Sequence, residues 1–341
     1  DLIAPEERAR VCWIVINKFR GDRTLFDDGI RFLRERTGIP VLGVLPYLRD
    51  LALDQEDSLD VGTRALASFT VNQVNIAVLL VPHMSNFTDF NALAEEADVA
   101  LRYVATPEEA VGADVMILPG SKTTLSDLAY LREKGFDRLL QDHVQRGGEL
   151  VGICGGYQML GQWIADPDGV ETGGQDAGLG MLPVTTRLAR DKITEQVEAR
   201  ALHIEGSAAL AVRGYLIHMG RTDRAGLRPC FQLLRTSGRI NSDGTEHARD
   251  EDCLDGAVRH DGLVWGTYVH GLFDQPDFRR AWLNRLRGRK GLPAVPFEAS
   301  QRVNETRLKA MDRWADHVDQ HLDLRSEEHT SELQSPDLIS Y

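Results

Sequence analysis

Short apolar runs alternate with helical patterns along most of the chain, and this alternation constrains the fold more than any other feature. The runs that read as buried strands are 11–17, 41–45, 76–81, 115–118 and 150–153. Residues 25–36 have apolar side chains at helical spacing between the first two runs. A strand, a helix and a parallel strand form a βαβ unit, and repeating this unit predicts a doubly wound α/β protein.

Other stretches extend this pattern. Residues 88–97 and 125–146 are predicted helices, and later strands are expected at 213–218 and 263–269. Residues 166–180 are rich in Gly and Asp, which favours a loop. The two series of strands indicate more than one domain.

We divide the chain by composition and pattern. Residues 1–72 hold the first strand–helix–strand unit, 73–289 hold the second series, and 290–324 form a C-terminal helical extension. Residues 325–341 resemble the translation of a sequencing-adapter oligonucleotide, so we treat them as an artefact tail outside the fold.

Composition narrows the function. A chain of 341 residues suggests about two domains, and its net charge of −13 argues against binding to nucleic acid or to an anionic membrane. No apolar run reaches the roughly 18 residues of a membrane span. The four cysteines are irregularly spaced, so we expect no metal site and a reducing cytoplasm. Because residue 1 is Asp, we also expect a missing N-terminal portion.

The clearest chemical motif surrounds Cys154. It lies in Gly152-Ile153-Cys154-Gly155-Gly156, an apolar strand precedes it, and a helical stretch follows. This is the G-x-nucleophile-x-G elbow, in which glycines allow a tight strand-to-helix turn and the helix N-terminus favours a thiolate. Glycine-flanked cysteines also occur as structural residues, but strand, elbow and helix together favour a nucleophile.

A cysteine nucleophile needs a general acid and base, and His270 is the candidate. It ends the apolar strand predicted at 263–269, and ligands bind at the carboxyl ends of strands in open α/β sheets. His218 also ends an apolar strand, so either a substrate-lining or a structural role fits it. The remaining histidines are read as structural.

The stretch from Gly120 to Thr124 resembles the end of a phosphate-binding loop. The full pattern needs Gly directly before Lys122 and another Gly five residues earlier, and Ser121 and Met116 occupy those positions. We therefore interpret Gly120 and Ser121 as a turn whose backbone amides supply half of an oxyanion hole. No complete phosphate-loop pattern occurs elsewhere in the sequence.

Three segments identify a family. LPGSKTT (118–124), GICGGYQMLG (152–161) and GTYVHGLFD (266–274) resemble the class I, or triad-type, glutamine amidotransferases. NKFRGD (17–22), PVLGVLPYL (40–48) and VPHMSNFTDFNAL (81–93) resemble the cobyric acid synthase branch. The resemblance extends from residue 1 to about residue 324.

The resemblance implies a flavodoxin-like amidotransferase domain preceded by the C-terminal remnant of a P-loop, dethiobiotin-synthetase-like ATPase domain. In the family, that ATPase uses ATP and Mg²⁺ to activate corrin carboxylates, and glutamine supplies the ammonia. The implied reaction amidates the b, d, e and g side chains of adenosylcobyrinate a,c-diamide in cobalamin biosynthesis. Asn17 would then contact adenine, although a turn-capping role is also open.

The family mechanism assigns roles to residues of this chain. Cys154 attacks the glutamine amide, while the amides of Gly155 and of the 120–121 turn hold the oxyanion. Gln158 is a candidate glutamine-binding residue. His270 protonates the leaving ammonia and then activates water.

The chain departs from the family pattern in two ways. The phosphate loop is absent. Many class I amidotransferases also place a Glu two residues after the catalytic histidine, where this chain has Leu272, so the site is a Cys–His dyad unless another acid substitutes. The alternatives are a cobyrinate a,c-diamide synthase, another class I amidotransferase acting on a cell-wall lipid intermediate, a hydrolase on the same scaffold, and a non-catalytic regulatory or binding module.

Overall fold

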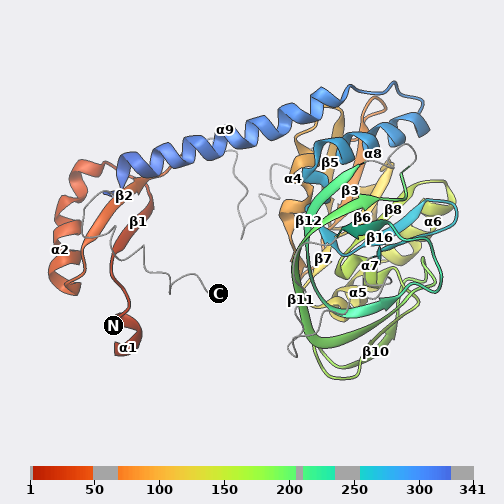
Figure 1. Cartoon of the computed structure of the whole chain (residues 1–341), viewed down its shortest axis with the longest axis horizontal. Helices are drawn as coiled ribbons and strands as arrows, with labels where there is room; N and C mark the ends of the chain where they lie inside the picture. Colours follow the sequence, from red (N-terminus) through yellow and green to blue (C-terminus); the bar gives the residue numbers. More distant parts are fainter. Residues whose placement is uncertain (1–2, 49–67, 205–209, 235–253, 324–341) are drawn as a thin grey trace. The chain divides into compact units, whose positions relative to one another are not determined.

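A computed structural model describes residues 3–48, 68–204, 210–234 and 254–323 (Figure 1). The chain divides into two compact units, Asp1–Leu53 with Glu305–Tyr341, and Asp54–Asn304. The tail that we excluded, 325–341, lies outside the described residues, as does most of 50–72. Within the described ranges, no helix combines the length and apolar character needed to cross a membrane.

The first unit contains the βαβ piece that the sequence predicts. Its elements are α1 (Pro5–Arg8), β1 (Ile14–Phe19), η1 (Arg23–Phe26), α2 (Asp27–Thr37) and β2 (Val41–Pro46). Strands β1 and β2 pair in parallel, which confirms the predicted unit. Helix α2 ends at Gly38, whose φ of 70° suits a glycine.

The second unit is built on a six-stranded sheet in the order β15-β16-β8-β6-β3-β5. Its strands are β3 (Val74–Leu79), β5 (Val99–Val104), β6 (Val115–Leu118), β8 (Glu149–Ile153), β16 (Val264–Thr267) and β15 (Ala257–Val258). All pair in parallel except the edge strand β15. The chain passes from β3 to β5 and then returns across β3 to β6, so the strand order reverses between β3 and β6.

Helices lie between these strands in the sequence. They are η2 (Phe87–Phe90), α4 (Asn91–Ala94), η3 (Pro107–Ala110), α5 (Thr124–Glu133), α6 (Phe136–Gln145) and α7 (Gly155–Met159). After the last strand come η5 (Leu272–Asp274), α8 (Pro276–Arg289) and α9 (Phe297–His321), and α9 continues into the first unit. The single helix predicted at 125–146 is two helices, because Gly135 is left-handed at φ 79°. The helix predicted at 88–97 is shorter than expected and begins as a 3-10 turn.

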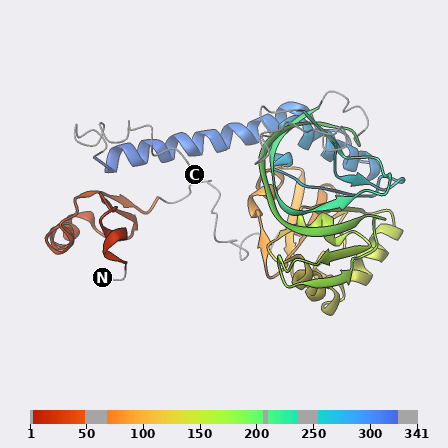
Figure 2. The same cartoon turned by 60° about the horizontal axis from the view of Figure 1, so that its bottom comes forward.

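A second, seven-stranded sheet is the main feature that the sequence pattern did not reveal. It contains β9 (Trp163–Asp166), β10 (Gly174–Ala177), β11 (Thr185–Ala201), β12 (Ala211–Asp223), β13 (Phe231–Leu234), β14 (Leu254–Asp255) and β17 (Val269–His270). Figure 2 shows β11 and β12 as long curved strands. The loop predicted at 166–180 is wrong over β10, because that polar segment pairs with β9 along its whole length.

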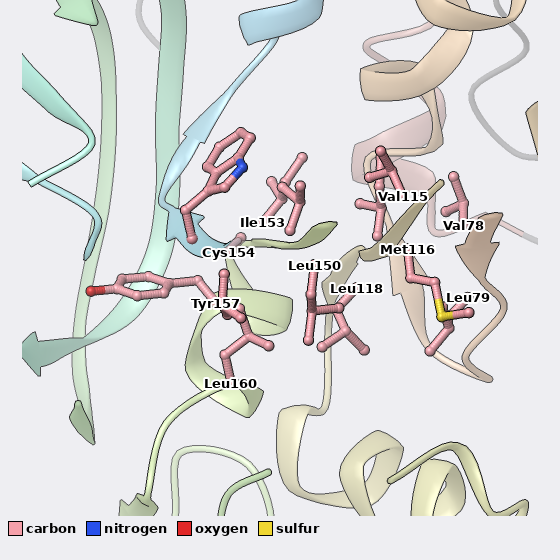
Figure 3. Close-up of a cluster of buried hydrophobic side chains, with 14 of the residues drawn as sticks. Val78, Leu79, Val115, Met116, Leu118, Leu150, Ile153, Cys154, Tyr157 and Leu160 are labelled. Carbon is pink, nitrogen blue, oxygen red and sulfur yellow. The ribbon is translucent and has the colours of Figure 1, made fainter. Parts of the chain in front are cut away.

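The core of the second unit is one cluster of buried apolar side chains from the six-stranded sheet, the helices beside it and the second sheet. Figure 3 shows part of it, with side chains from β3, β6 and β8 and with Tyr157 of α7. Glu149, fully buried on β8, accepts hydrogen bonds from the indoles of Trp265 and Trp282. It also pairs with Arg285 and Arg289, so one carboxylate joins α8 to the sheet.

His203 is a buried polar group in an aromatic setting. Its ring lies 4.6 Å from that of Trp265 and 5.4 Å from that of Phe231, and its Nε2 has no hydrogen-bond partner within the described residues. Burial lowers the pKa of His203 from 6.5 to about 3. Between these two pH values, the imidazole is therefore neutral in the folded protein and protonated in the unfolded chain.

We predict that His203 makes the fold sensitive to acid. The pKa of His203 is lower in the folded protein than in the unfolded chain. Its contribution to the free energy of unfolding is therefore fully present above pH 6.5 and is lost as the pH falls toward about 3. At about 1.4 kcal/mol per pKa unit, the loss reaches a few kcal/mol. Urea unfolding between pH 7 and pH 4.5 should show a flatter pH dependence for His203→Phe than for the parent. His260→Phe, at an exposed position, is the control, and equal slopes for all three proteins would contradict the prediction.

Candidate active site

The structure places Cys154 in a tight turn between β8 and α7 (Figure 3). Its backbone has φ 53° and ψ −111°, a conformation that non-glycine residues rarely adopt, and its N–H donates to the Thr267 carbonyl at 2.8 Å. A Cβ on Gly156 would lie 2.1 Å from the carbonyl oxygen of Leu118. The turn is therefore free of this clash only with glycine at 156, which lets α7 contact the end of β6 directly.

His270 lies in β17, beyond the carboxyl end of β16, and is fully buried. Its Nδ1 is 2.7 Å from Oδ2 of Asp89, and Oδ1 of the same carboxylate accepts the N–H of Gly271 at 2.8 Å. Its Nε2 makes no hydrogen bond of normal geometry within the described residues. Burial lowers the pKa of His270, but the Asp89 carboxylate and the neighbouring Cys154 thiol raise it to about 10.

The predicted turn at Gly120 and Ser121 forms the short strand β7 (Gly120–Ser121), which pairs with β4 (Met84–Ser85). A Cβ on Gly155 would lie 2.9 Å from the Ser121 nitrogen, and a Cβ on Gly120 would lie 3.4 Å from Cε1 of His270. This turn is thus in contact with both the elbow and the histidine.

A buried aspartate anchors the same turn. Ser121 donates its hydroxyl to Asp127 at 2.6 Å, and the other oxygen of Asp127 is 2.9 Å from Nδ1 of His83. Asp127 is fully buried. A carboxylate at this position repels phosphate, so the geometry supports interpreting Gly120 and Ser121 as a turn and not as a phosphate loop.

Gln158 is buried on α7, and both the nitrogen and the oxygen of its side-chain amide form hydrogen bonds within the protein. Its Nε2 donates to the Met219 carbonyl at 3.0 Å and to the Tyr268 hydroxyl at 3.2 Å, and its Oε1 accepts from Thr124 at 3.1 Å. The predicted glutamine-binding residue therefore holds strand β12 beside the site through its amide.

Strand β12 runs along the site and contributes further side chains. The Cys154 thiol donates to the Ile217 carbonyl at 3.4 Å. The His218 ring stacks on Tyr268, with centroids 3.8 Å apart. The structure therefore brings His218 near the predicted site, next to the partners of Gln158.

Asn17 is not part of this group, because it belongs to the other unit. It is exposed on β1, and its Oδ1 accepts the N–H of Lys18 at 2.8 Å, where Lys18 has φ 54°. This bond to the next residue leaves both alternatives for Asn17, adenine contact and turn capping, as predictions.

The sequence reasoning missed Asp89, Asn86 and Tyr215. Asp89 and Asn86 lie in the VPHMSNFTDFNAL segment, which served only to indicate a family. The available signal was position: this segment follows the carboxyl end of β3, next to the point where the strand order reverses.

The sheet and the elbow define an α/β domain that presents a side chain at a strand-to-helix turn. Residues 75–278 match the model of the CobB/CobQ-like glutamine amidotransferase domain, and the chain belongs to this family. Among relatives, it is 41% identical over 330 residues to the cobyric acid synthase of Nostoc punctiforme, covering 95% of this chain and 63% of that protein. The cobyric acid synthase of Salmonella gallinarum is 46% identical over 330 residues, covering 94% of this chain and 62% of that protein.

The chain thus spans less than two thirds of the length of these relatives. Among solved structures, PurLQS from Thermotoga maritima superposes with a TM-score of 0.43 at 15% identity, over 70% of this chain and 99% of that one.

We predict that Gly156→Ala destabilises the second unit. The added Cβ would meet a backbone oxygen, which cannot rotate away, so the free energy of unfolding should fall by about 1–3 kcal/mol. Gly288→Ala on α8 is the matched control, because nothing lies within 4 Å of its Cβ and alanine favours a helix. Urea unfolding measures both variants, and equal stabilities would contradict the prediction.

Proposed function

We propose that this chain hydrolyses glutamine, with Cys154 as the nucleophile and His270 as the general acid and base. The observation that supports this most strongly is the position of both residues at the carboxyl edge of one sheet, in a chain of the glutamine amidotransferase family. The nearly buried Cys154 and the fully buried His270 sit where bulk water is limited.

In the proposed reaction, Cys154 Sγ forms a bond to the side-chain amide carbon of glutamine. The tetrahedral intermediate then breaks its C–N bond, and His270 gives a proton to the departing nitrogen, which leaves as ammonia. His270 next accepts a proton from a water molecule that attacks the glutamyl thioester. The C–S bond breaks, glutamate leaves, and the thiolate is restored.

The oxyanion of this intermediate needs fixed donors. The Gly155 amide opens α7, and the 120–121 turn lies against Gly155 and His270, so these backbone groups are the proposed oxyanion hole. Asp127 holds the turn through Ser121 and thereby limits its movement.

We propose further that the whole protein is a cobyric acid synthase, which amidates corrin carboxylates with the ammonia released here and uses ATP and Mg²⁺. The supporting observation is the similarity to the two cobyric acid synthases along almost the entire chain. The GSKTT stretch (120–124) does not fit a phosphate site, because it lacks the two glycines that the phosphate-loop pattern places before its lysine, and Ser121 binds the buried Asp127. This chain therefore contributes the glutamine half of that reaction, in the cytoplasm.

Substitution of the nucleophile tests the glutaminase. Cys154→Ala should abolish ammonia release from glutamine, because it removes the thiol that forms the proposed thioester, and Cys12→Ala at an exposed site should retain it. A glutamine-analogue electrophile should label Cys154 selectively, even where turnover depends on a partner domain. A folded parent that neither releases ammonia nor is labelled at Cys154 would favour a non-catalytic module.

The acceptor is tested with amide-¹⁵N glutamine, ATP and the protein of the full gene. Label should enter adenosylcobyrinate a,c-diamide if the protein is a cobyric acid synthase. Label that enters only cobyrinate, or only a cell-wall lipid intermediate, would identify one of the other class I amidotransferases.

A further inference from the structure

We propose that Asp89 is the positioning residue for His270, taking the role that a glutamate two residues after the histidine has in many class I amidotransferases. The inference rests on the proposed glutaminase function and extends it to a residue in the turn after β3. The VPHMSNFTDFNAL segment then serves the glutamine site through Asp89 and Asn86.

Both oxygens of Asp89 contact the histidine segment. Oδ2 lies 2.7 Å from Nδ1 of His270, and Oδ1 accepts the N–H of Gly271 at 2.8 Å. Because the carboxylate can only accept, Nδ1 must carry its proton, and this fixes the tautomer. In the neutral ring, Nε2 is then the free acceptor that a general base needs.

In this chain, the residue two positions after the histidine is not an acid. Leu272, two residues after His270, is fully buried in the apolar core at the start of η5. The carboxylate that contacts His270 belongs instead to Asp89, which lies 181 residues earlier in the sequence, after the carboxyl end of β3.

The same turn also reaches the His270 ring through Asn86 and Tyr215. The Tyr215 ring stacks on His270, with centroids 5.2 Å apart and planes inclined by 15°. Asn86 donates its side-chain amide to the Tyr215 hydroxyl at 2.8 Å. Residues 86–89 thus reach the imidazole directly through Asp89 and indirectly through Tyr215.

The titratable groups that face His270 come from three elements. They are Asp89 on η2, Cys154 before α7, and Tyr215 on β12, with Asp274 of η5 acting on Tyr215. Burial alone lowers the pKa of His270, and the Asp89 carboxylate leads the groups that raise it. Without that charge, the imidazolium should lose its proton at a lower pH, and the imidazolium–thiolate pair should exist over a narrower range.

Asp89→Asn in the complete chain tests this role. We expect kcat for glutamine hydrolysis to fall by about 10²–10⁴-fold, with KM little changed, because the ring loses its orientation and charge partner while the substrate contacts remain. The pH midpoint of Cys154 alkylation by iodoacetamide should rise by about one unit or more. Nitrogen NMR should show His270 titrating at a lower pH than in the parent.

Asp98→Asn is the matched control. Asp98 is also a mostly buried carboxylate, paired with Arg280 and Arg287 away from the site. Its loss should lower the melting temperature without moving either pH profile. If Asp89→Asn does not fold, Asp89→Glu keeps the charge on a longer side chain, and we expect reduced kcat with a His270 titration near that of the parent.

The outcomes separate the two proposals. An unchanged kcat or an unchanged His270 titration in Asp89→Asn, or a His270 titration in Asp89→Glu well below that of the parent, would overturn the role of Asp89. A parent without glutaminase activity and without selective labelling at Cys154 would overturn the proposed function instead, and the NMR titration would still measure the effect of Asp89 on the histidine.

Discussion

The contact between α7 and the end of β6 is the constraint on which the site depends. Gly156 lies against the Leu118 carbonyl, and the Cys154 N–H is bonded to the Thr267 carbonyl. These two contacts link β6, β8 and β16 at their carboxyl ends. Cys154 lies between them with a strained backbone, and its side chain contacts Ile217 of β12 and His270 of β17. The rest of the site is arranged around a nucleophile whose position is set by backbone atoms.

Sheet topology explains which segments meet there. In a parallel sheet the carboxyl ends of all strands lie on one edge, so the segments after β3, β6, β8 and β16 converge. They bring Asp89, Ser121, Cys154 and His270 respectively to that edge. The second sheet then covers the edge with β12, whose carbonyls contact Cys154 and Gln158.

The parts of this arrangement that the sequence predicts are those with local signals. An apolar strand, a glycine-flanked cysteine and a histidine at a strand end are each visible within about ten residues. The structure places the first two as expected, but the strand predicted at 263–269 is two strands, β16 and β17, and His270 lies in β17 of the second sheet. Strand β11 was missed because its residues are mostly polar and its few buried side chains alternate with exposed ones, so no apolar run marks it. Asp89 was missed for another reason: its partner is distant in the sequence, and only the position of its segment after β3 pointed to the site.

Two fully buried histidines show why the distant carboxylate matters. His203 lies among aromatic rings and its pKa falls to about 3, whereas His270 beside Asp89 has a pKa raised to about 10. Burial disfavours the charged form in both cases, so the difference comes from the neighbouring charge. A buried carboxylate is itself costly unless it is paired, and Asp89 meets that need with His270 and Gly271. Each partner therefore offsets part of the cost of burying the other, and in this chain, which has Leu272 two residues after His270, the carboxylate that does so lies on η2.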